Sequence, residues 1–149
     1  MEDFELKIID ELDERQKKVV EAAVKAIETS YSPYSKFAVG AALLLEDGSI
    51  ITGSNQENMA YPSGTCAERA ALFTYGSKGL SSKITKLAVF ARFHDSESLA
   101  FGAPCGGCRQ VMLEYELNQK HPFEVIFFHS NSYVISSSAK SLLPYHFQL

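Results

Sequence analysis

Three cysteines and one glutamate are the residues in this sequence whose types and spacing best suit chemistry. Cys105 and Cys108 are separated by two residues, and Cys66 stands alone upstream, two residues before Glu68. Three cysteines cannot all form disulfides within one chain, and three soft sulfur ligands favour zinc. None of the four histidines keeps a consistent spacing from the cysteines. The sequence therefore predicts three protein ligands and one open position, which is typical of a catalytic zinc site.

Both cysteine clusters lie where helices are expected to begin. Cys66 follows a Gly-Thr pair, and Cys105 follows Pro104. A helix N-terminus carries partial positive charge and unpaired N–H groups, which lower the pKa of a thiol there. Because Cys105 and Cys108 are three residues apart, their sulfurs share one side of the expected helix. If the two N-termini meet above a sheet, the three sulfurs converge.

Two charged residues next to Cys66 extend this predicted site. Glu68 is close enough to carry a proton of a metal-bound water without itself binding the metal. Arg69 follows Cys66 by three residues and can donate hydrogen bonds to the thiolates. A zinc ion with three thiolates has net negative charge, and the guanidinium would offset it.

The elements that must position these residues follow from hydrophobic periodicity and from turn residues. The patterns predict helices over 13–31, 66–76, 105–118 and 138–143, and strands over 37–45, 50–53, 84–93, 124–128 and 133–135. This order indicates an α/β fold with three layers, α-β-α, around a mixed five-stranded sheet. Residues 13–149 are expected to form a single domain, after an N-terminal extension at 1–12 that is a loose arm or a short helix.

Composition narrows the class of protein. The 149 residues are 46% hydrophobic and 21% charged, which excludes a disordered chain. The net charge is −4 and the basic residues are scattered, so a nucleic-acid partner is disfavoured. The longest apolar run, 37–45, is about half a membrane span, and the N-terminus is acidic. We expect a cytoplasmic protein with no membrane partner and a small, neutral substrate.

Five segments in order resemble the homotetrameric zinc-dependent cytidine deaminase family. The resemblance covers roughly residues 15 to 149. Its segments are Pro-Tyr-Ser-Lys-Phe-Ala-Val-Gly-Ala-Ala from Pro33, Asn-Gln-Glu-Asn from Asn55, Cys-Ala-Glu-Arg from Cys66, Pro-Cys-Gly-Gly-Cys-Arg-Gln from Pro104, and Leu-Leu-Pro with Phe147 at the C-terminal end. The sequence departs from the family in a longer N-terminal extension, a longer 92–103 connection that carries His94, and an end two residues after Phe147.

The resemblance implies an activity and a substrate. It implies hydrolytic deamination of cytidine and 2′-deoxycytidine to uridine and deoxyuridine with release of ammonia, as in pyrimidine salvage. Zn²⁺ would be bound by Cys66, Cys105 and Cys108, and Glu68 would carry the protons.

The resemblance also implies how a pyrimidine nucleoside is bound. Asn55 and Glu57 would hold a ribose hydroxyl, and Phe37 would pack against the pyrimidine. Phe147 would reach the base of a neighbouring subunit, which implies a homotetramer.

The residues taken one by one leave other interpretations open. The cysteine pair could be a redox dithiol, or the cluster a structural zinc site. Asn55 and Glu57 could be ordinary turn residues, and Phe147 a frayed terminal side chain. A deaminase of another small molecule, or of a polynucleotide, would share the zinc ligands. The pair Asn55 and Glu57 argues for a ribose, and the net charge argues against a polynucleotide.

Overall fold

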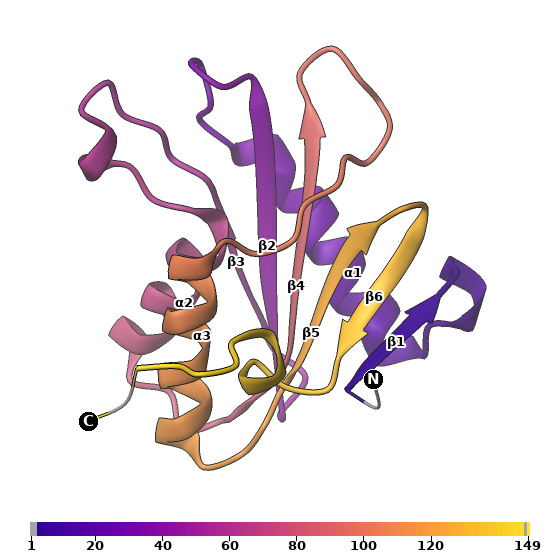
Figure 1. Ribbon diagram of the computed structural model, residues 1–149, viewed down its shortest axis with the longest axis vertical. Coiled ribbons are helices and arrows are strands. Elements are labelled where there is room, and N and C mark those ends of the chain that lie inside the picture. Colours follow the sequence, from indigo (N-terminus) through magenta and orange to yellow (C-terminus); the bar gives the residue numbers. More distant parts are fainter. Residues whose placement is uncertain (1–2, 148) are drawn as a thin grey trace.

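A six-stranded mixed sheet forms the middle layer of the protein, whose computed structural model describes residues 3–147 and 149. The strand order is β1-β6-β5-β4-β2-β3 (Figure 1). β4 and β5 are parallel, and every other neighbouring pair is antiparallel. The strands are β1 (Phe4–Lys7), β2 (Phe37–Leu45), β3 (Ile50–Ser54), β4 (Ile84–Phe93), β5 (Glu124–His129) and β6 (Ser132–Ser136).

Helices cover both faces of this sheet, which confirms the three-layer α/β prediction. α1 (Glu14–Ala26) packs on one face, and α2 (Ala67–Lys78) and α3 (Gly106–Gln119) pack on the other (Figure 1). Each interface has its own buried apolar cluster. Among residues 3–147 and 149, no helix has the length and apolarity needed to cross a lipid bilayer.

The sheet has six strands and not the predicted five. The additional strand, β1, lies within the predicted extension 1–12 and pairs antiparallel with β6, where a loose arm or short helix was expected. An edge strand presents unpaired N–H and C=O groups, and β1 pairs with those of β6 while Phe4 packs against the core. Residues 1 and 2 of the extension lie outside the described part of the chain.

Other element boundaries differ modestly from the predictions. The helix predicted over 13–31 ends earlier, at Ala26, and continues as a single 3₁₀ turn. The helix predicted over 138–143 is a 3₁₀ turn alone. The described 3₁₀ turns are Ile9–Glu11, Ile27–Thr29, Tyr61–Ser63 and Lys140–Leu142.

Two glycines allow the helices to approach the sheet closely. A Cβ atom on Gly40 of β2 would collide with the backbone of α1. On the other face, a Cβ on Gly53 of β3 would lie 2.5 Å from the Ala71 nitrogen and 2.6 Å from the Ala67 carbonyl oxygen of α2. The start of α2, directly after Cys66, is therefore packed against the sheet with no side chain between them.

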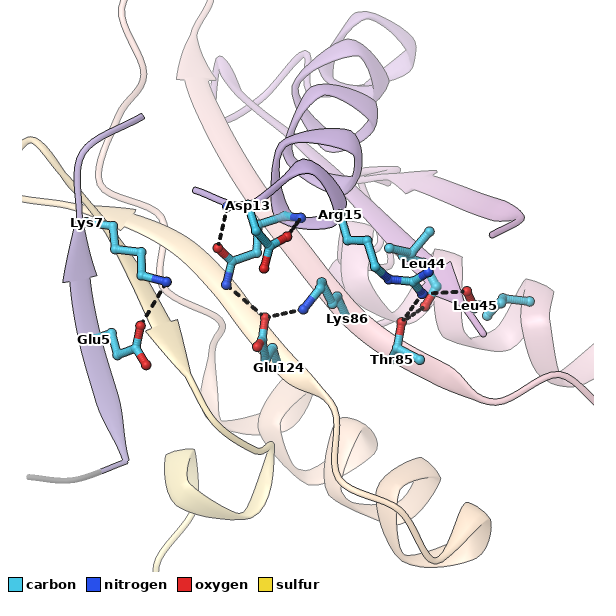
Figure 2. Close-up of polar contacts among 10 residues, drawn as sticks. Glu5, Lys7, Asp13, Arg15, Leu44, Leu45, Thr85, Lys86 and Glu124 are labelled. Carbon is cyan, nitrogen blue, oxygen red and sulfur yellow. Dashed lines mark hydrogen bonds and ion pairs between the residues drawn. The ribbon is translucent and has the colours of Figure 1, made fainter. Parts of the chain in front are cut away.

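Hydrogen bonds and an ion pair fix the N-terminus of α1 over β4 and β5 (Figure 2). Asp13 caps the helix by accepting from the backbone N–H of Gln16 at 2.7 Å. The Gln16 side chain donates to Glu124 at 3.1 Å, and Glu124 pairs with the largely buried Lys86 at 2.7 Å. This network lies at the end of the sheet away from the cysteines, so it supports the scaffold and not the site.

Candidate active site

The three cysteines converge where α2 and α3 begin. Cys66 is the N-cap residue of α2, Cys105 is the N-cap of α3, and Cys108 lies in the first turn of α3. Their sulfur atoms all lie within 4.8 Å of one another, and all three thiols are free of disulfides. Neither N-cap side chain accepts a capping hydrogen bond from the backbone of its own helix. The structure thus brings together sulfurs from two segments that are far apart in the sequence.

This donor set fits zinc. Sulfurs placed tetrahedrally around zinc, at a Zn–S distance of about 2.3 Å, would be roughly 3.8 Å apart. The upper limit of 4.8 Å between the sulfurs is compatible with that spacing. Cys108 is fully buried, Cys66 is half-buried and Cys105 is exposed. The cluster therefore has a protein-covered side and an open side, which suits three ligands and one exchangeable position.

The surroundings of Cys66 favour its thiolate form. A hydrogen bond from the Cys108 thiol, and then the guanidinium of Arg69, lower the pKa of the Cys66 thiol to about 5, although burial acts in the opposite direction. Arg69 Nη2 lies 3.3 Å from Cys66 Sγ. Arg69 Nε is buried and has no hydrogen-bond partner among the described residues. The guanidinium therefore neutralises sulfur charge and retains a donor for another acceptor.

Glu68 lies in the first turn of α2 and lines the cavity over the cysteines. Only 4% of its surface is exposed, and burial raises the pKa of its carboxyl group to about 7. A carboxyl group with a pKa near neutrality can both accept and donate a proton. Beside a cluster of soft metal ligands, this arrangement suits metal-assisted hydrolysis in which one residue carries the protons.

A cavity of about 570 Å³ opens over the cluster, a size suited to a small molecule. Its walls bring together most of the residues that the sequence singled out. They include Phe37, Asn55, Glu57, Cys66, Glu68, Arg69 and Cys105. Apolar side chains of the sheet and of the segment before α3 complete it, namely Val39, Val89, Ala91 and Ala103.

Backbone groups of the loop before β2 hold Glu57, one of the polar residues that line this cavity. Glu57 Oε2 accepts from the N–H groups of Tyr34 and Ser35 at 3.0 and 3.2 Å. Burial would raise the pKa of Glu57, but hydrogen bonds from Ser35 and Tyr34 outweigh it and the pKa is lowered. Glu57 is therefore a carboxylate at neutral pH, ready to accept from a hydroxyl group.

Phe147 is the predicted site residue that the structure brings neither to the sulfur cluster nor to the cavity wall. Its side chain is 72% exposed, and its carbonyl oxygen accepts from Gln110 on α3 at 3.4 Å. Sequence reasoning, for its part, gave no role to Tyr34 and Ser35, whose N–H groups hold Glu57. The Ser-Pro-Tyr-Ser turn before β2 was a possible signal, because such turns expose backbone donors.

Comparisons with known proteins agree with this geometry. Residues 13–122 match the family described as the cytidine and deoxycytidylate deaminase zinc-binding region. The chain is 50% identical over 98 residues to the cytidine deaminase of Sporosarcina psychrophila, covering 66% of this chain and 68% of the relative. It is 43% identical over 103 residues to a cytidine deaminase of Mycobacterium tuberculosis, covering 67% of this chain and 73% of the relative.

Solved structures agree as well. The crystal structure of cytidine deaminase from Burkholderia pseudomallei has a TM-score of 0.71 at 39% identity, and covers 87% of this chain and 97% of its own. The crystal structure of cytidine deaminase from Mycobacterium tuberculosis has a TM-score of 0.70 at 34% identity, and covers 92% of this chain and 100% of its own.

The three-layer fold, the three-cysteine cluster and the buried Glu68 define a zinc-dependent hydrolase. The family match spans most of the chain, and relatives above 30% identity are covered over two thirds of their length. The chain belongs to the cytidine deaminase family.

Proposed function

We propose that this chain hydrolyses the exocyclic amino group of cytidine and 2′-deoxycytidine, giving uridine or deoxyuridine and ammonia. One observation carries the proposal: a single cavity is lined by Cys66, Cys105 and Glu68 and also by Asn55 and Glu57. A nucleoside needs both sets of residues, one for the base and one for the sugar. This reaction recovers pyrimidine nucleosides, as in pyrimidine salvage.

We assign the metal to three thiolates. Cys66, Cys105 and Cys108 would hold zinc, and Arg69 would offset part of their charge through its bond to Cys66. Zinc bound by these residues would supply Lewis acidity, which lowers the pKa of a water molecule.

Glu68 would carry the protons in this proposal. Its carboxylate takes the proton of the attacking water and delivers it to ring N3, which makes C4 more electrophilic. The same group then takes the remaining proton of that water from the C4 hydroxyl and passes it to the amino group, which leaves as ammonia while C4 becomes a carbonyl. A buried carboxyl group with a pKa near 7 suits both directions of transfer.

Three side chains would orient the nucleoside. Phe37 lines the cavity beside the sheet and would pack against the pyrimidine, while Asn55 and Glu57 would bind a ribose hydroxyl. The support is that both polar residues line the same cavity as Cys66 and Glu68, with backbone donors keeping Glu57 ionised.

The assembly is part of the proposal too. An exposed Phe147 with no contact in its own cavity suits insertion into a neighbouring subunit, and we propose a homotetramer. Three free thiols that bind metal are best maintained in a reducing compartment, which supports a cytoplasmic location.

Metal analysis and a substrate panel test the function. The protein should contain about one zinc per chain and release ammonia from cytidine and 2′-deoxycytidine. Cytosine should be poorer on the order of 10³-fold or more, because a site built for a hydroxyl discriminates against its absence. A single-stranded oligodeoxynucleotide serves as the comparison substrate. Equal rates on cytosine and cytidine, or faster turnover of the oligonucleotide, would contradict the proposal.

A further inference from the structure

A line of hydrogen bonds leads from the loop after β4 to the proposed sugar-binding part of the cavity. His94 Nε2 lies 2.8 Å from Ser32 Oγ, and Ser32 Oγ lies 2.9 Å from Ser30 Oγ. Ser30 Oγ in turn donates to Asn55 Oδ1 at 2.5 Å. We call these four residues the relay. The relay joins three loops at one end of the sheet, over 30–36, 55–65 and 94–103 (Figure 1).

The direction of each hydrogen bond in the relay is determined by its Asn55 end. Asn55 Oδ1 accepts from the Val39 N–H at 2.9 Å, and Asn55 Nδ2 donates to the Phe37 carbonyl oxygen at 2.9 Å. Those two backbone partners settle the orientation of the amide. Ser30 therefore faces an acceptor and must donate its single hydroxyl proton to it.

The donors of the two remaining hydrogen bonds follow because each hydroxyl group has a single proton. Because the Ser30 proton is used, Ser32 must donate to Ser30, and the Ser32 proton is then used as well. His94 Nε2 must then carry a proton and donate to Ser32. The neutral Nε2–H tautomer and the imidazolium ion both satisfy this requirement.

The relay lies in a setting that can hold it. Ser32 is 2% exposed, so its hydroxyl has little water to turn toward. The backbone N–H of His94 donates to the Lys36 carbonyl oxygen at 3.0 Å, directly before β2. Asn55 lines the cavity, and its amide has a second N–H with no acceptor in the described part of the chain.

We propose that His94 is a positioning residue for nucleoside binding, acting through Ser32 and Ser30 on Asn55. Its N–H sets the direction of both hydroxyls, so that Asn55 Oδ1 is held by two donors and the second amide N–H is kept for a sugar oxygen. Without that N–H, the two hydroxyls can reverse and Ser30 no longer donates to Asn55. This inference rests on the proposed sugar-binding role of Asn55.

Steady-state kinetics on the zinc-loaded enzyme test the relay. His94→Leu removes the donor and should raise KM for cytidine by about threefold to tenfold, the usual effect of one neutral hydrogen bond, with kcat unchanged. His94→Gln places an N–H at similar reach and should stay within about twofold of wild type. The matched control, His121→Leu, alters an exposed histidine elsewhere and should change nothing. Zinc content and melting temperature verify that each variant is folded.

A double-mutant cycle with Asn55→Ala separates the relay from a general effect on structure. If His94 acts through Asn55, adding His94→Leu to Asn55→Ala should raise KM no further. Ser30→Ala removes the last donor and should match His94→Leu, so the relay stays testable even if His94→Leu folds poorly.

The contrary outcomes distinguish failure of the relay from failure of the proposed sugar contact. An unchanged KM in His94→Leu, a Gln variant as impaired as the Leu variant, or an equal effect in both Asn55 backgrounds overturns the relay alone. An Asn55→Ala enzyme with normal KM and normal preference for cytidine over cytosine overturns both the relay and the proposed sugar contact.

Discussion

The proposed metal-binding part of the cavity, the metal end, and its proposed sugar-binding part, the sugar end, are built in different ways. At the metal end, Cys66 and Cys105 are N-cap residues of regular helices, and Gly53 lets α2 rest directly on the sheet. At the sugar end, Asn55 and Glu57 lie on a loop, and hydrogen bonds with other loops and with the backbone of β2 hold them. The metal end is thus positioned by packed secondary structure, and the sugar end by hydrogen bonds.

This difference predicts that substitutions at the two ends have different effects on zinc binding, stability and turnover. Changes at the metal end should affect zinc, stability and turnover together, because the same helices form the core and present the ligands. A change at Glu57 should affect recognition alone, because its bonds run only to the loop before β2. A change at Asn55 should also cost some stability, because its amide holds the backbone of β2. The following predictions run from the largest expected effect to the smallest.

Removal of a sulfur ligand should have the largest effect. Cys108 is fully buried and lies at the start of α3, so Cys108→Ala should lose zinc, lose activity and melt at a lower temperature. Metal analysis and thermal unfolding measure this, and wild-type protein stripped with a chelator is the matched comparison. If Cys108→Ala retained one zinc per chain, Cys108 would not be a ligand.

Glu68→Gln should separate turnover from zinc binding. The amide preserves size and hydrogen bonding but cannot carry protons, so kcat should fall by a factor on the order of 10² or more while zinc content stays at the wild-type level. Glu114→Gln, an exposed change on α3, is the control. Near-normal turnover in Glu68→Gln would remove Glu68 from the mechanism.

Glu57→Ala should impair recognition without affecting the metal end. Loss of a charged acceptor should reduce the preference for cytidine over cytosine by about tenfold to a hundredfold, with zinc content and melting temperature preserved. The control is Glu97→Ala, because Glu97 is an exposed carboxylate outside the cavity. A large drop in melting temperature for Glu57→Ala would show that the two ends are not built independently.

Much of the fold was predictable because its signals are local. The start of α1 at Asp13, the buried β2 and the helix starts after both cysteine positions all follow from caps and periodicity within a few residues. β1 was not predictable on this basis. Its four residues carry a weak pattern, and its partner β6 lies at the other end of the chain, so only tertiary pairing makes it a strand.

The same distinction between local signals and tertiary contacts decides which features of the site were predictable. Sequence spacing predicted that the three cysteines converge, since both clusters sit at the starts of helices. It could not predict the relay from His94 to Asn55, because that contact requires the end of β4 to lie beside the start of β2. Nor can one chain show where an exposed Phe147 belongs, because the destination in the proposal lies in another subunit.

Phe147→Ala is expected to have the smallest effect and to extend the comparison beyond one chain. An aromatic contact of this kind contributes about 0.5–1.5 kcal/mol beyond area burial, so the variant should bind substrate a few-fold more weakly and retain zinc. Substrate KM and zinc content measure this. Because the side chain is exposed in its own chain, melting of the monomer fold should be unaffected.

Mixed assemblies decide whether Phe147 acts in its own chain or in a neighbour. Phe147→Ala chains keep Glu68, and Glu68→Ala chains keep Phe147. If Phe147 reaches a neighbouring cavity, some cavities of a mixed tetramer combine an intact Glu68 with an intact Phe147. Activity should then exceed the sum of the two parents, each measured alone at the same chain concentration. Mixed tetramers, verified by mass, with no gain over that sum would place the action of Phe147 within its own chain, and a fully active monomer would rule out the shared cavity.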